Sequence, residues 1–337
     1  MSRIAVIGGH GFYGARVVAA LQSAGHQVLP ASRSSTSTRV DLSDPSTFEA
    51  LASCDAVVNA SDSVLAPPDL LASWCLDNGL PLFEMGADLP GTERLLQISP
   101  NARQGHLIVG VGVFPGLSTA LGTAAYQAEA ESDTVELSVR MSPLSGAGTG
   151  TIELMTASLT TPSVCWRDGR RHEGPPIGAQ STQPFLRTGS APAVLIALPD
   201  APLLARSTSA RNVRTSMSPN PSWLRFNFRL LVQMLAWAGP LKPLLEKATT
   251  AMMRVVRGVL LRERHSALEL SAVAGDTRMM LAFDDGQEAT GLGTAAAVLT
   301  WLQRQPPSPG VYGAAEVLPL DEWLENYRAL GGQVQRG

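Results

Sequence analysis

A doubly wound α/β domain, with a second α+β domain inserted into it, is the fold class that the sequence predicts. Three observations predict it. Up to about residue 115, short apolar runs alternate with turns and helical patterns, which is typical of a parallel sheet. A glycine-rich turn follows the first apolar run. From Leu117 onward this alternation stops, and alternating strands and Pro- and Ser-rich segments take its place.

The composition indicates a globular protein of about two domains. The chain has 337 residues, of which 45% are hydrophobic and 16% charged, so it has enough apolar side chain to exclude a disordered protein. Its net charge of −3 gives no overall basic field, and we expect no nucleic-acid partner. Three cysteines without paired spacing, and a first strand that starts at residue 3, favour a cytoplasmic protein.

The elements of the first domain follow one another at short intervals. A strand is expected at Arg3–Ile7, and a helix at Phe12–Ala24 ends before Gly25. Further strands are expected at Gln27–Ala31, Asp55–Ala60, Leu82–Glu84 and Leu107–Val111, with a helix at Pro68–Asn78. Together they predict a parallel sheet of five strands covered by helices.

The second half predicts an antiparallel sheet with helices. Asp168-Gly169 marks a hairpin, and Pro175–Pro192 and Asn212–Pro221 are interpreted as long loops because they are rich in Pro, Ser, Thr and Asn or Gln. The remaining elements are strands at Thr134–Met141, Ala267–Ala274 and Arg278–Asp284, and helices at Leu117–Glu129, Thr294–Gln303 and Leu320–Leu330. We expect residues 1–118 to bind a dinucleotide, residues 119–288 to form a substrate and dimerisation domain, and residues 289–337 to return to the first domain.

The glycine-rich turn has the GxGxxG spacing, directly after a strand and before a helix. In this spacing the first glycine permits a tight turn, the second lets a pyrophosphate approach the backbone, and the third allows close helix–strand packing. The helix N-terminus then faces the phosphates. The motif predicts a Rossmann dinucleotide site, with a structural glycine turn as the alternative, at Gly9, His10, Gly11, Phe12, Tyr13 and Gly14.

The end of the second strand favours NADP over NAD. A carboxylate there would bind the ribose 2′-hydroxyl, but the chain has Ser32, Arg33 and Ser34, which suit a 2′-phosphate. A solvated surface arginine is the alternative. The first acid downstream, Asp41, is a further candidate for cofactor binding, as are Asn59, Ala60 and Ser61 at the end of the third strand.

Several familiar chemistries are absent from the sequence. No Tyr-x-x-x-Lys pair and no GxSxG motif occur, and the five histidines lack the spacing of metal ligands. We therefore expect no metal. Hydride transfer from a nicotinamide remains, with the protein supplying orientation and electrostatics.

The chain resembles the saccharopine dehydrogenase/saccharopine reductase-like oxidoreductases. Its Ile4–Arg33 stretch and the Cys-bearing helix and strand at Trp74–Glu84 are similar to that family. So is Val109–Ser118, with its Gly-rich strand end followed by Pro-Gly-Leu-Ser. Near the end, Thr290–Ala295 and Pro309–Tyr312 resemble the family's return to the nucleotide domain.

The resemblance implies a Rossmann domain completed by the C-terminal segment, an NADP cofactor, and a nicotinamide near Phe114, Pro115 and Gly116. It implies a small-molecule substrate with a C=N bond, or a C=C bond as in lipid-reducing relatives. Phe114 stands where relatives often carry an acid, which favours an apolar, acyl-like substrate. Asp88 is the candidate for proton transfer or substrate orientation, and a turn residue is the alternative.

A basic and apolar stretch, Trp223–Arg264, is the remaining feature. From Ala201 to Arg262 ten arginines and lysines accompany one acid, Glu246. An amphipathic surface that contacts anionic lipid or an acyl group is one interpretation, and helices packed on the second domain are the other. Two alternatives to an enzyme stay open: an NADP-binding sensor or scaffold without turnover, and a peripheral membrane protein acting through residues 223–264. A homodimer is the expected assembly.

Overall fold

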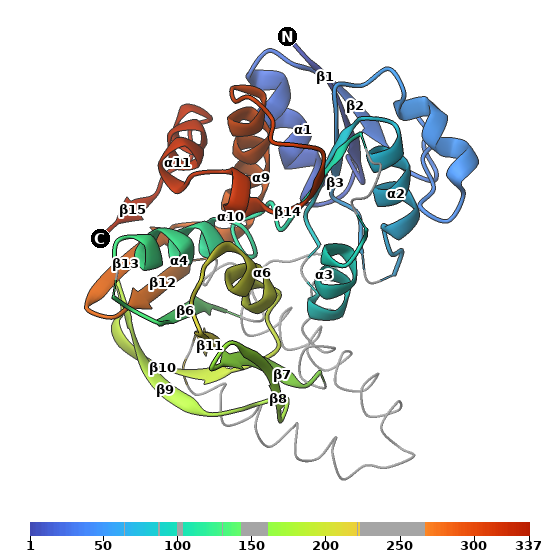
Figure 1. Ribbon diagram of the computed structural model, residues 1–337. Helices are drawn as coiled ribbons and strands as arrows, with labels where there is room; N and C mark the ends of the chain where they lie inside the picture. Colours follow the sequence, from blue (N-terminus) through green and yellow to red (C-terminus); the bar gives the residue numbers. More distant parts are fainter. Residues whose placement is uncertain are drawn as a thin grey trace, which may run out of the picture. The chain divides into compact units, whose positions relative to one another are not determined.

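The computed structural model describes residues 1–337 except 64, 87, 100–103, 130, 143–160, 221 and 223–266. The predicted amphipathic stretch, residues 223–264, therefore lies outside the described residues. The chain forms two compact units (Figure 1). The first unit comprises residues 1–120 and 288–333, and the second comprises residues 121–287 and 334–337.

The first unit contains a six-stranded sheet in the order β14-β5-β4-β3-β1-β2, and every neighbouring pair is parallel. The doubly wound parallel sheet is therefore confirmed, with β14 as a sixth strand contributed by the C-terminal segment. Its strands are β1 (Arg3–Ile7), β2 (Gln27–Ala31), β3 (Ala56–Asn59), β4 (Pro81–Glu84), β5 (His106–Val109) and β14 (Gly310–Gly313).

Helices cover this sheet on both faces. Helix α1 packs on β1 and β2, and α2, which packs on β4 and β5, lies on the other face (Figure 1). Gly291 of α9 lies against Arg16 of α1, so α9 packs beside α1. The helical elements are α1 (Gly14–Ser23), η1 (Pro45–Leu51), α2 (Asp69–Asp77), α3 (Leu89–Leu96), α9 (Gly286–Leu302), α10 (Ala314–Val317) and α11 (Leu320–Ala329).

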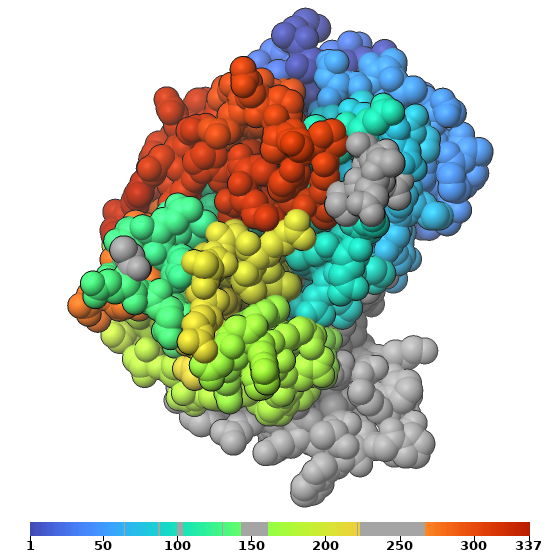
Figure 2. Space-filling view, in the orientation of Figure 1, coloured from blue at the N-terminus to red at the C-terminus, as the bar shows by residue number. Residues whose placement is uncertain are grey.

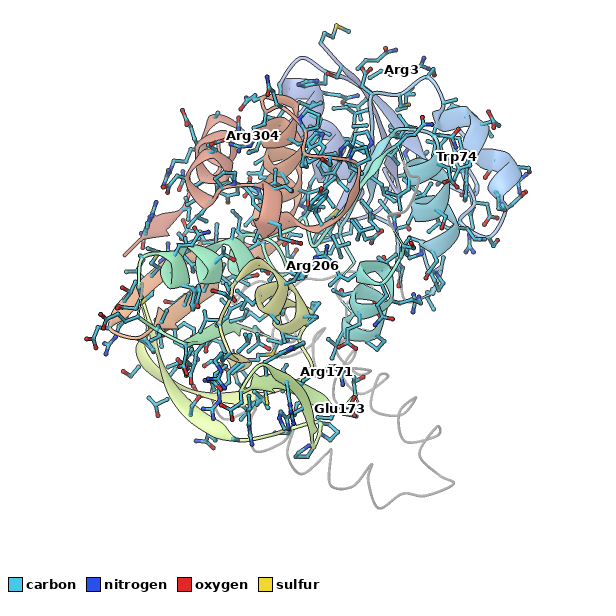
Figure 3. All side chains as sticks on the ribbon, in the orientation of Figure 1. Arg3, Trp74, Arg171, Glu173, Arg206 and Arg304 are labelled. Atoms are coloured by element: carbon cyan, nitrogen blue, oxygen red, sulfur yellow. The ribbon has the colours of Figure 1, made fainter. Side chains whose placement is uncertain are left out.

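Contacts distant in sequence hold the first unit together. Figure 2 shows the C-terminal residues of this unit, in red, packed against its N-terminal residues, in blue. Trp74 of α2, labelled in Figure 3, meets the ring of Phe48 edge to face with centroids 6.0 Å apart. Trp323 of α11 is buried and donates from Nε1 to the Gly293 carbonyl of α9 at 2.7 Å.

The second unit contains a mixed sheet in the order β15-β13-β12-β6-β11-β10-β9, with the hairpin β7–β8 attached to β11. It confirms the α+β class, although β6 and β11 run parallel while the other pairs are antiparallel. Its elements are α4 (Leu117–Gln127, which begins in the first unit), β6 (Thr134–Met141), β7 (Ser163–Arg167), β8 (Arg170–Gly174), β9 (Gln180–Phe185), β10 (Gly189–Leu195), α6 (Asp200–Ser207), β11 (Asn212–Pro219), β12 (Leu268–Ala274), β13 (Thr277–Phe283) and β15 (Gln335–Arg336).

Two predicted loops are wrong. Residues 175–192 contain β9 and the start of β10, and residues 212–221 contain β11. Their polar and Pro-rich composition argued against strands, but β11 pairs with β6 over its full length, from Asn212 with Thr134 to Pro219 with Met141. Pairing with a central strand outweighs weak local propensity.

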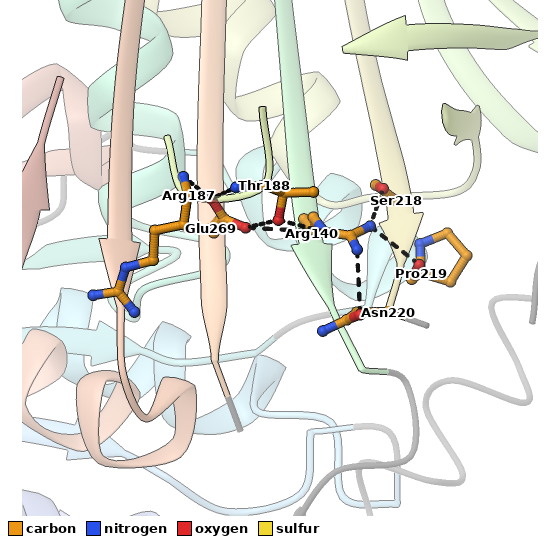
Figure 4. Close-up of polar contacts among 7 residues, drawn as sticks. All are labelled: Arg140, Arg187, Thr188, Ser218, Pro219, Asn220 and Glu269. Atoms are coloured by element: carbon orange, nitrogen blue, oxygen red, sulfur yellow. Dashed lines mark hydrogen bonds and ion pairs between the residues drawn. The ribbon is translucent and has the colours of Figure 1, made fainter. Parts of the chain in front are cut away.

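A buried polar network crosses the centre of the second sheet (Figure 4). Arg140 on β6 lies opposite Glu269 on β12, and their Nε and Oε1 atoms are 3.9 Å apart. Arg140 Nη1 donates to Ser218 Oγ at 2.9 Å and to the Pro219 carbonyl at 3.3 Å, and Nη2 donates to Asn220 Oδ1 at 3.2 Å. Arg140 is 8% exposed, and its charge is thus compensated inside the protein.

Among the described residues, no helix has both the length and the apolar character needed to cross a bilayer.

Candidate nucleotide-binding site

The sheet order of the first unit reverses direction at β1. Strand β1 lies between β2 and β3, so successive connections leave it on opposite sides. In open parallel sheets, ligands bind outside the carboxyl ends of the strands at such a reversal point. The structure places the glycine turn after β1 and the Asn59–Ser61 segment at the end of β3, at this edge.

The glycines of the turn are required by backbone geometry, although not as the spacing predicts. The residue with positive φ is Gly8, at 74°, so the tight turn is made one position before the predicted Gly9. Gly9 is required for packing, because a Cβ there would lie 2.8 Å from the Val6 carbonyl oxygen and 2.9 Å from Pro30. Gly14 is buried against Gly8, while Gly11 is exposed and its amide donates to the Gly8 carbonyl at 2.8 Å. The turn therefore presents an open backbone at Gly11.

Aromatic and cationic side chains flank this turn. His10 and Phe12 are exposed, and Phe12 contacts Tyr13 edge to face with centroids 5.0 Å apart. Arg16 places its guanidinium 4.2 Å above the Phe12 ring, and its Nη1 donates to the Phe12 carbonyl at 2.6 Å. Sequence reasoning missed Arg16, whose signal is a cation on the first turn of the helix that follows the motif. Its charge adds to that of the helix N-terminus.

The segment after β2 presents two arginines. Arg33 and Ser34 are exposed, and Ser32 exchanges backbone hydrogen bonds, donating to Thr38 at 3.3 Å and accepting from Val40 at 3.1 Å. These bonds turn the chain back, so that Arg39 pairs with Ser32 in an isolated parallel bridge. Sequence reasoning missed Arg39, which is also exposed.

The Asp41 side chain stabilises the turn in which it lies. Its carboxylate accepts from Ser43 Oγ at 2.7 Å and from the Ser43 amide at 3.0 Å. These hydrogen bonds, and then the charges of Arg39 and Arg33, lower the pKa of Asp41. Its side chain therefore organises the segment that carries the two arginines, and a contact with the cofactor stays a prediction.

A carboxyl group lies buried beside the Asn59–Ser61 segment. Glu84 at the end of β4 is 0% exposed, and its Oε2 accepts from Asn59 Nδ2 at 2.7 Å. Asn59 Oδ1 in turn accepts from Ser61 Oγ at 2.6 Å and from the Ser61 amide at 3.2 Å. The Ala60–Ser61 backbone lies against Gly8, where a Cβ would meet it at 2.9 Å. Glu84 is thus linked through one side chain to the backbone behind the glycine turn.

The second oxygen of Glu84 has two further donors. Ser63 Oγ and the Gly86 amide both donate to Oε1 at 2.7 Å. Burial raises the pKa of Glu84 to about 7, in spite of the opposing effect of these hydrogen bonds and that from Asn59. Sequence reasoning recorded Glu84 only as the acid ending the strand, because spacing alone does not reveal its burial.

The segment Phe114–Gly116 follows β5 at the same edge of the sheet, before α4. The Phe114–Pro115 peptide is cis, and the Gly112 amide donates to the Pro115 carbonyl at 2.8 Å. Gly116 has a φ of 141°, and a Cβ there would overlap the backbone of Gly112. This tight turn sets the start of α4. Strands β3 and β4 lie between it and the glycine turn.

Asp88 caps a helix that the sequence analysis did not predict. It precedes α3, and its Oδ2 accepts from the Gly91 amide at 2.7 Å. Such a cap stabilises the helix N-terminus, which accounts for an aspartate in this turn. A role of Asp88 in proton transfer stays a prediction.

Comparison with known proteins first finds a family model that is similar to the N-terminal part of the chain. The model of the NAD dependent epimerase/dehydratase family matches residues 4–98, which contain the glycine turn, the arginine pair and Glu84. A search of curated proteins gives no significant match.

One solved structure then extends the likeness in fold to the whole chain. Apo saccharopine dehydrogenase (L-Glu forming) from Saccharomyces cerevisiae is similar with a TM-score of 0.60 and 11% identity, over 100% of this chain and 99% of that one. Amine dehydrogenase from Mycobacterium smegmatis gives a TM-score of 0.46 and 13% identity, over 94% and 96%. The resemblance to saccharopine dehydrogenases is therefore confirmed at the level of the fold.

Proposed function

We propose that this protein is an NADP-dependent oxidoreductase of the saccharopine dehydrogenase-like type. It would transfer hydride between the nicotinamide and a C=N or C=C bond of a small or acyl-like substrate. The observation that carries the proposal is the edge of the first-unit sheet, where an exposed glycine turn lies at the reversal point and two exposed arginines follow the neighbouring strand. The likeness to the epimerase/dehydratase model over residues 4–98 supports a nicotinamide dinucleotide.

The glycine turn fits a pyrophosphate. The amides of Ala15 and Arg16 donate to the Gly11 and Tyr13 carbonyls, and the dipole of the helix still favours negative charge at its N-terminus. Gly11 lacks a side chain at the exposed position of the turn, so phosphate oxygens can approach its backbone. Arg16, held over Phe12, adds a positive charge to the same turn.

The segment after β2 fits the 2′-phosphate of NADP. Arg33 supplies a planar guanidinium that binds phosphate through two donors, and Ser32 and Ser34 supply hydroxyl groups. Arg39, brought back beside Ser32, is a second cation for the same phosphate. NAD lacks this phosphate and would leave the charges of both arginines opposed only by Asp41, whose pKa they lower.

The chemistry is divided between the cofactor and the chain. When bound, the cofactor supplies the hydride. The glycine turn binds the phosphates, and Arg33 selects NADP over NAD by binding the 2′-phosphate. The segment Phe114–Gly116 holds the nicotinamide, as the resemblance implies. The apolar ring of Phe114 beside this position favours an apolar or acyl-like substrate over a charged one.

Titration with NADPH and NADH tests the cofactor assignment. Replacing Arg33 with alanine removes a charged hydrogen-bond donor, so NADPH affinity should fall roughly 10- to 100-fold while NADH affinity changes less than about 3-fold. Arg328→Ala, an exposed arginine on α11 of the same unit, is the matched control and should change neither. Equal losses for both cofactors in Arg33→Ala would refute the 2′-phosphate contact.

A second variant tests the position of the cofactor. Gly11→Asp places a carboxylate at the exposed position of the turn, where it blocks and repels the pyrophosphate, so neither cofactor should bind measurably. Unchanged affinity would place the nucleotide elsewhere. Turnover is measured as a substrate-dependent change in absorbance at 340 nm across imines and acyl-like unsaturated compounds. Cofactor binding without turnover on any of them would favour the sensor or scaffold alternative.

A further inference from the structure

The carboxyl group of Glu84 is unusual in its surroundings. It is fully buried, and its three hydrogen-bond donors, from Asn59, Ser63 and Gly86, are all neutral. The register pairs it with Asn59 of β3 on one side and with Val109 of β5 on the other. The charge that acts on it comes from Asp88, at the start of α3, and has the same sign. A buried carboxylate without a cation favours its protonated form.

The network determines which oxygen can accept a proton. A proton on Oε2 would point at Asn59 Nδ2, which is itself a donor. Turning the Asn59 side chain over would not help, because its nitrogen would then face the backbone N–H of Ser61, which is also a donor. At Oε1 the partner is the Ser63 hydroxyl, which can rotate from donor to acceptor. Ser63 therefore lets Glu84 hold a proton without disturbing Asn59 or the backbone behind the glycine turn.

Given the nucleotide site proposed above, we propose that Glu84 and Ser63 form a proton-accepting pair that takes up a proton from solvent when the phosphates of the cofactor bind at this edge. The uptake balances one negative charge brought near a buried carboxylate. Glu84 Oε1 gains the proton, and the Ser63 hydroxyl rotates so that its oxygen accepts a hydrogen bond from the protonated carboxyl group. Cofactor affinity is then coupled to pH through Glu84. Glu84 does not contact the cofactor in this proposal: it acts on the bound phosphates through space, by the loss of its negative charge.

The size of the effect follows from simple electrostatics. A unit negative charge about 10 Å away, at an effective dielectric constant of about 20, raises the pKa of a buried carboxyl group by about one pH unit. Because the pKa of Glu84 is already raised to about 7, wild-type protein at pH 7.5 should take up roughly half a proton per NADPH bound through this group.

Calorimetric titration with NADPH at pH 7.5, in two buffers of different ionisation enthalpy, measures the protons taken up. Other groups, including the 2′-phosphate itself, also exchange protons, so the test is the difference between variants. Glu84→Gln should lower the uptake by roughly half a proton relative to wild type. Ser63→Ala, which keeps the carboxyl group but removes the rotating hydroxyl, should also lower it. Arg328→Ala is the control and should match wild type.

Each outcome decides a separate claim. If wild-type protein binds NADPH and Glu84→Gln takes up the same number of protons, the proton-accepting pair is refuted while the nucleotide site stands. If wild-type protein binds no NADPH, the proposed function itself fails. Should Glu84→Gln not fold, Ser63→Ala decides: unchanged uptake in a folded Ser63→Ala protein overturns the role of the pair.

Discussion

Glu84 in the first unit and Glu269 in the second are both buried carboxyl groups, at 0% and 6% exposure, but their partners differ. Glu269 faces the cation Arg140 and accepts from the Arg187 amide at 2.7 Å and from the amide and hydroxyl of Thr188. Glu84 has only neutral donors. Glu269 is therefore held in its ionised form by a cation within the second sheet. Glu84, at the edge of the first sheet, has no cation beside it among the described residues and can take up a proton.

Position in the sheet accounts for this difference. Glu269 and Arg140 lie opposite each other on neighbouring central strands, β12 and β6, so Glu269 has a cation beside it in addition to its neutral donors. Burial lowers the pKa of Arg140, and the charge of Glu269 opposes that effect. Glu84 ends its strand, where the turn after β4 supplies the Gly86 amide, and the segment that includes the end of β3 supplies Asn59 and Ser63, all of them neutral donors. The second unit therefore uses its carboxylate for stability, and the first unit can use its own for function.

Breaking the Arg140–Glu269 pair should have the largest effect. Arg140→Met leaves Glu269 buried without its cation, so the free energy of unfolding should fall by about 3 to 5 kcal/mol in urea denaturation. The matched control is Arg214→Ala, on β11 of the same sheet, whose pair with Glu136 is solvent-exposed and should contribute less than about 1 kcal/mol. Similar small losses in both variants would contradict the structural role of the buried pair.

The titration of Glu84 should affect stability next most strongly. Because the pKa of Glu84 is about 7 in the folded protein and 4.5 in a free chain, the native state binds more protons between these values. Its contribution is fully present below pH 4.5, and roughly 3 kcal/mol is lost as the pH rises to 7.

Glu84→Gln removes this titration, so the stability difference between wild type and the variant should change by that amount across the window. Urea denaturation at a series of pH values measures it. A difference that stays constant with pH would show that folding does not raise the pKa of Glu84.

The smallest expected effect on stability comes from removing single serine hydroxyl groups in the second sheet. Ser138, Ser216 and Ser271 lie side by side on β6, β11 and β12. Ser138 and Ser216 share a hydrogen bond of 2.7 Å, whereas the buried Ser271 hydroxyl has no partner among the described residues. Ser138→Ala should cost about 1 kcal/mol, and Ser271→Ala should be neutral or slightly stabilising, by thermal unfolding. Equal costs for the two variants would show that the shared hydrogen bond contributes nothing.

The sequence predicts the first unit well because its signals are local. Apolar runs such as Arg3–Ile7 are buried strands. The spaced glycines lie within one short turn, between β1 and α1, so the sequence alone reveals that turn. The second unit is harder to predict, because β9 and β11 are polar strands that depend on pairing with residues distant in sequence.

Within the candidate site, residues that contact neighbours along the chain could be predicted, and those brought together by folding could not. Arg33 was predicted from its place after a strand. Arg39 and Glu84 were not, since a backbone bridge to Ser32 and hydrogen bonds from β3 define their positions. Helix α3 was also missed: it begins with Pro90 near its first position and is capped by Asp88, a pattern that the turn-like sequence concealed.

Hydrogen exchange with and without NADPH tests the central claim most directly. NADPH should slow amide exchange in three segments of the first unit, Gly8–Gly14, Ser32–Arg39 and Asn59–Ser63, while NADH should protect the first and third but not Ser32–Arg39. Exchange that is unchanged in the glycine turn at saturating NADPH, or protection of Ser32–Arg39 that is the same with both cofactors, would contradict the account.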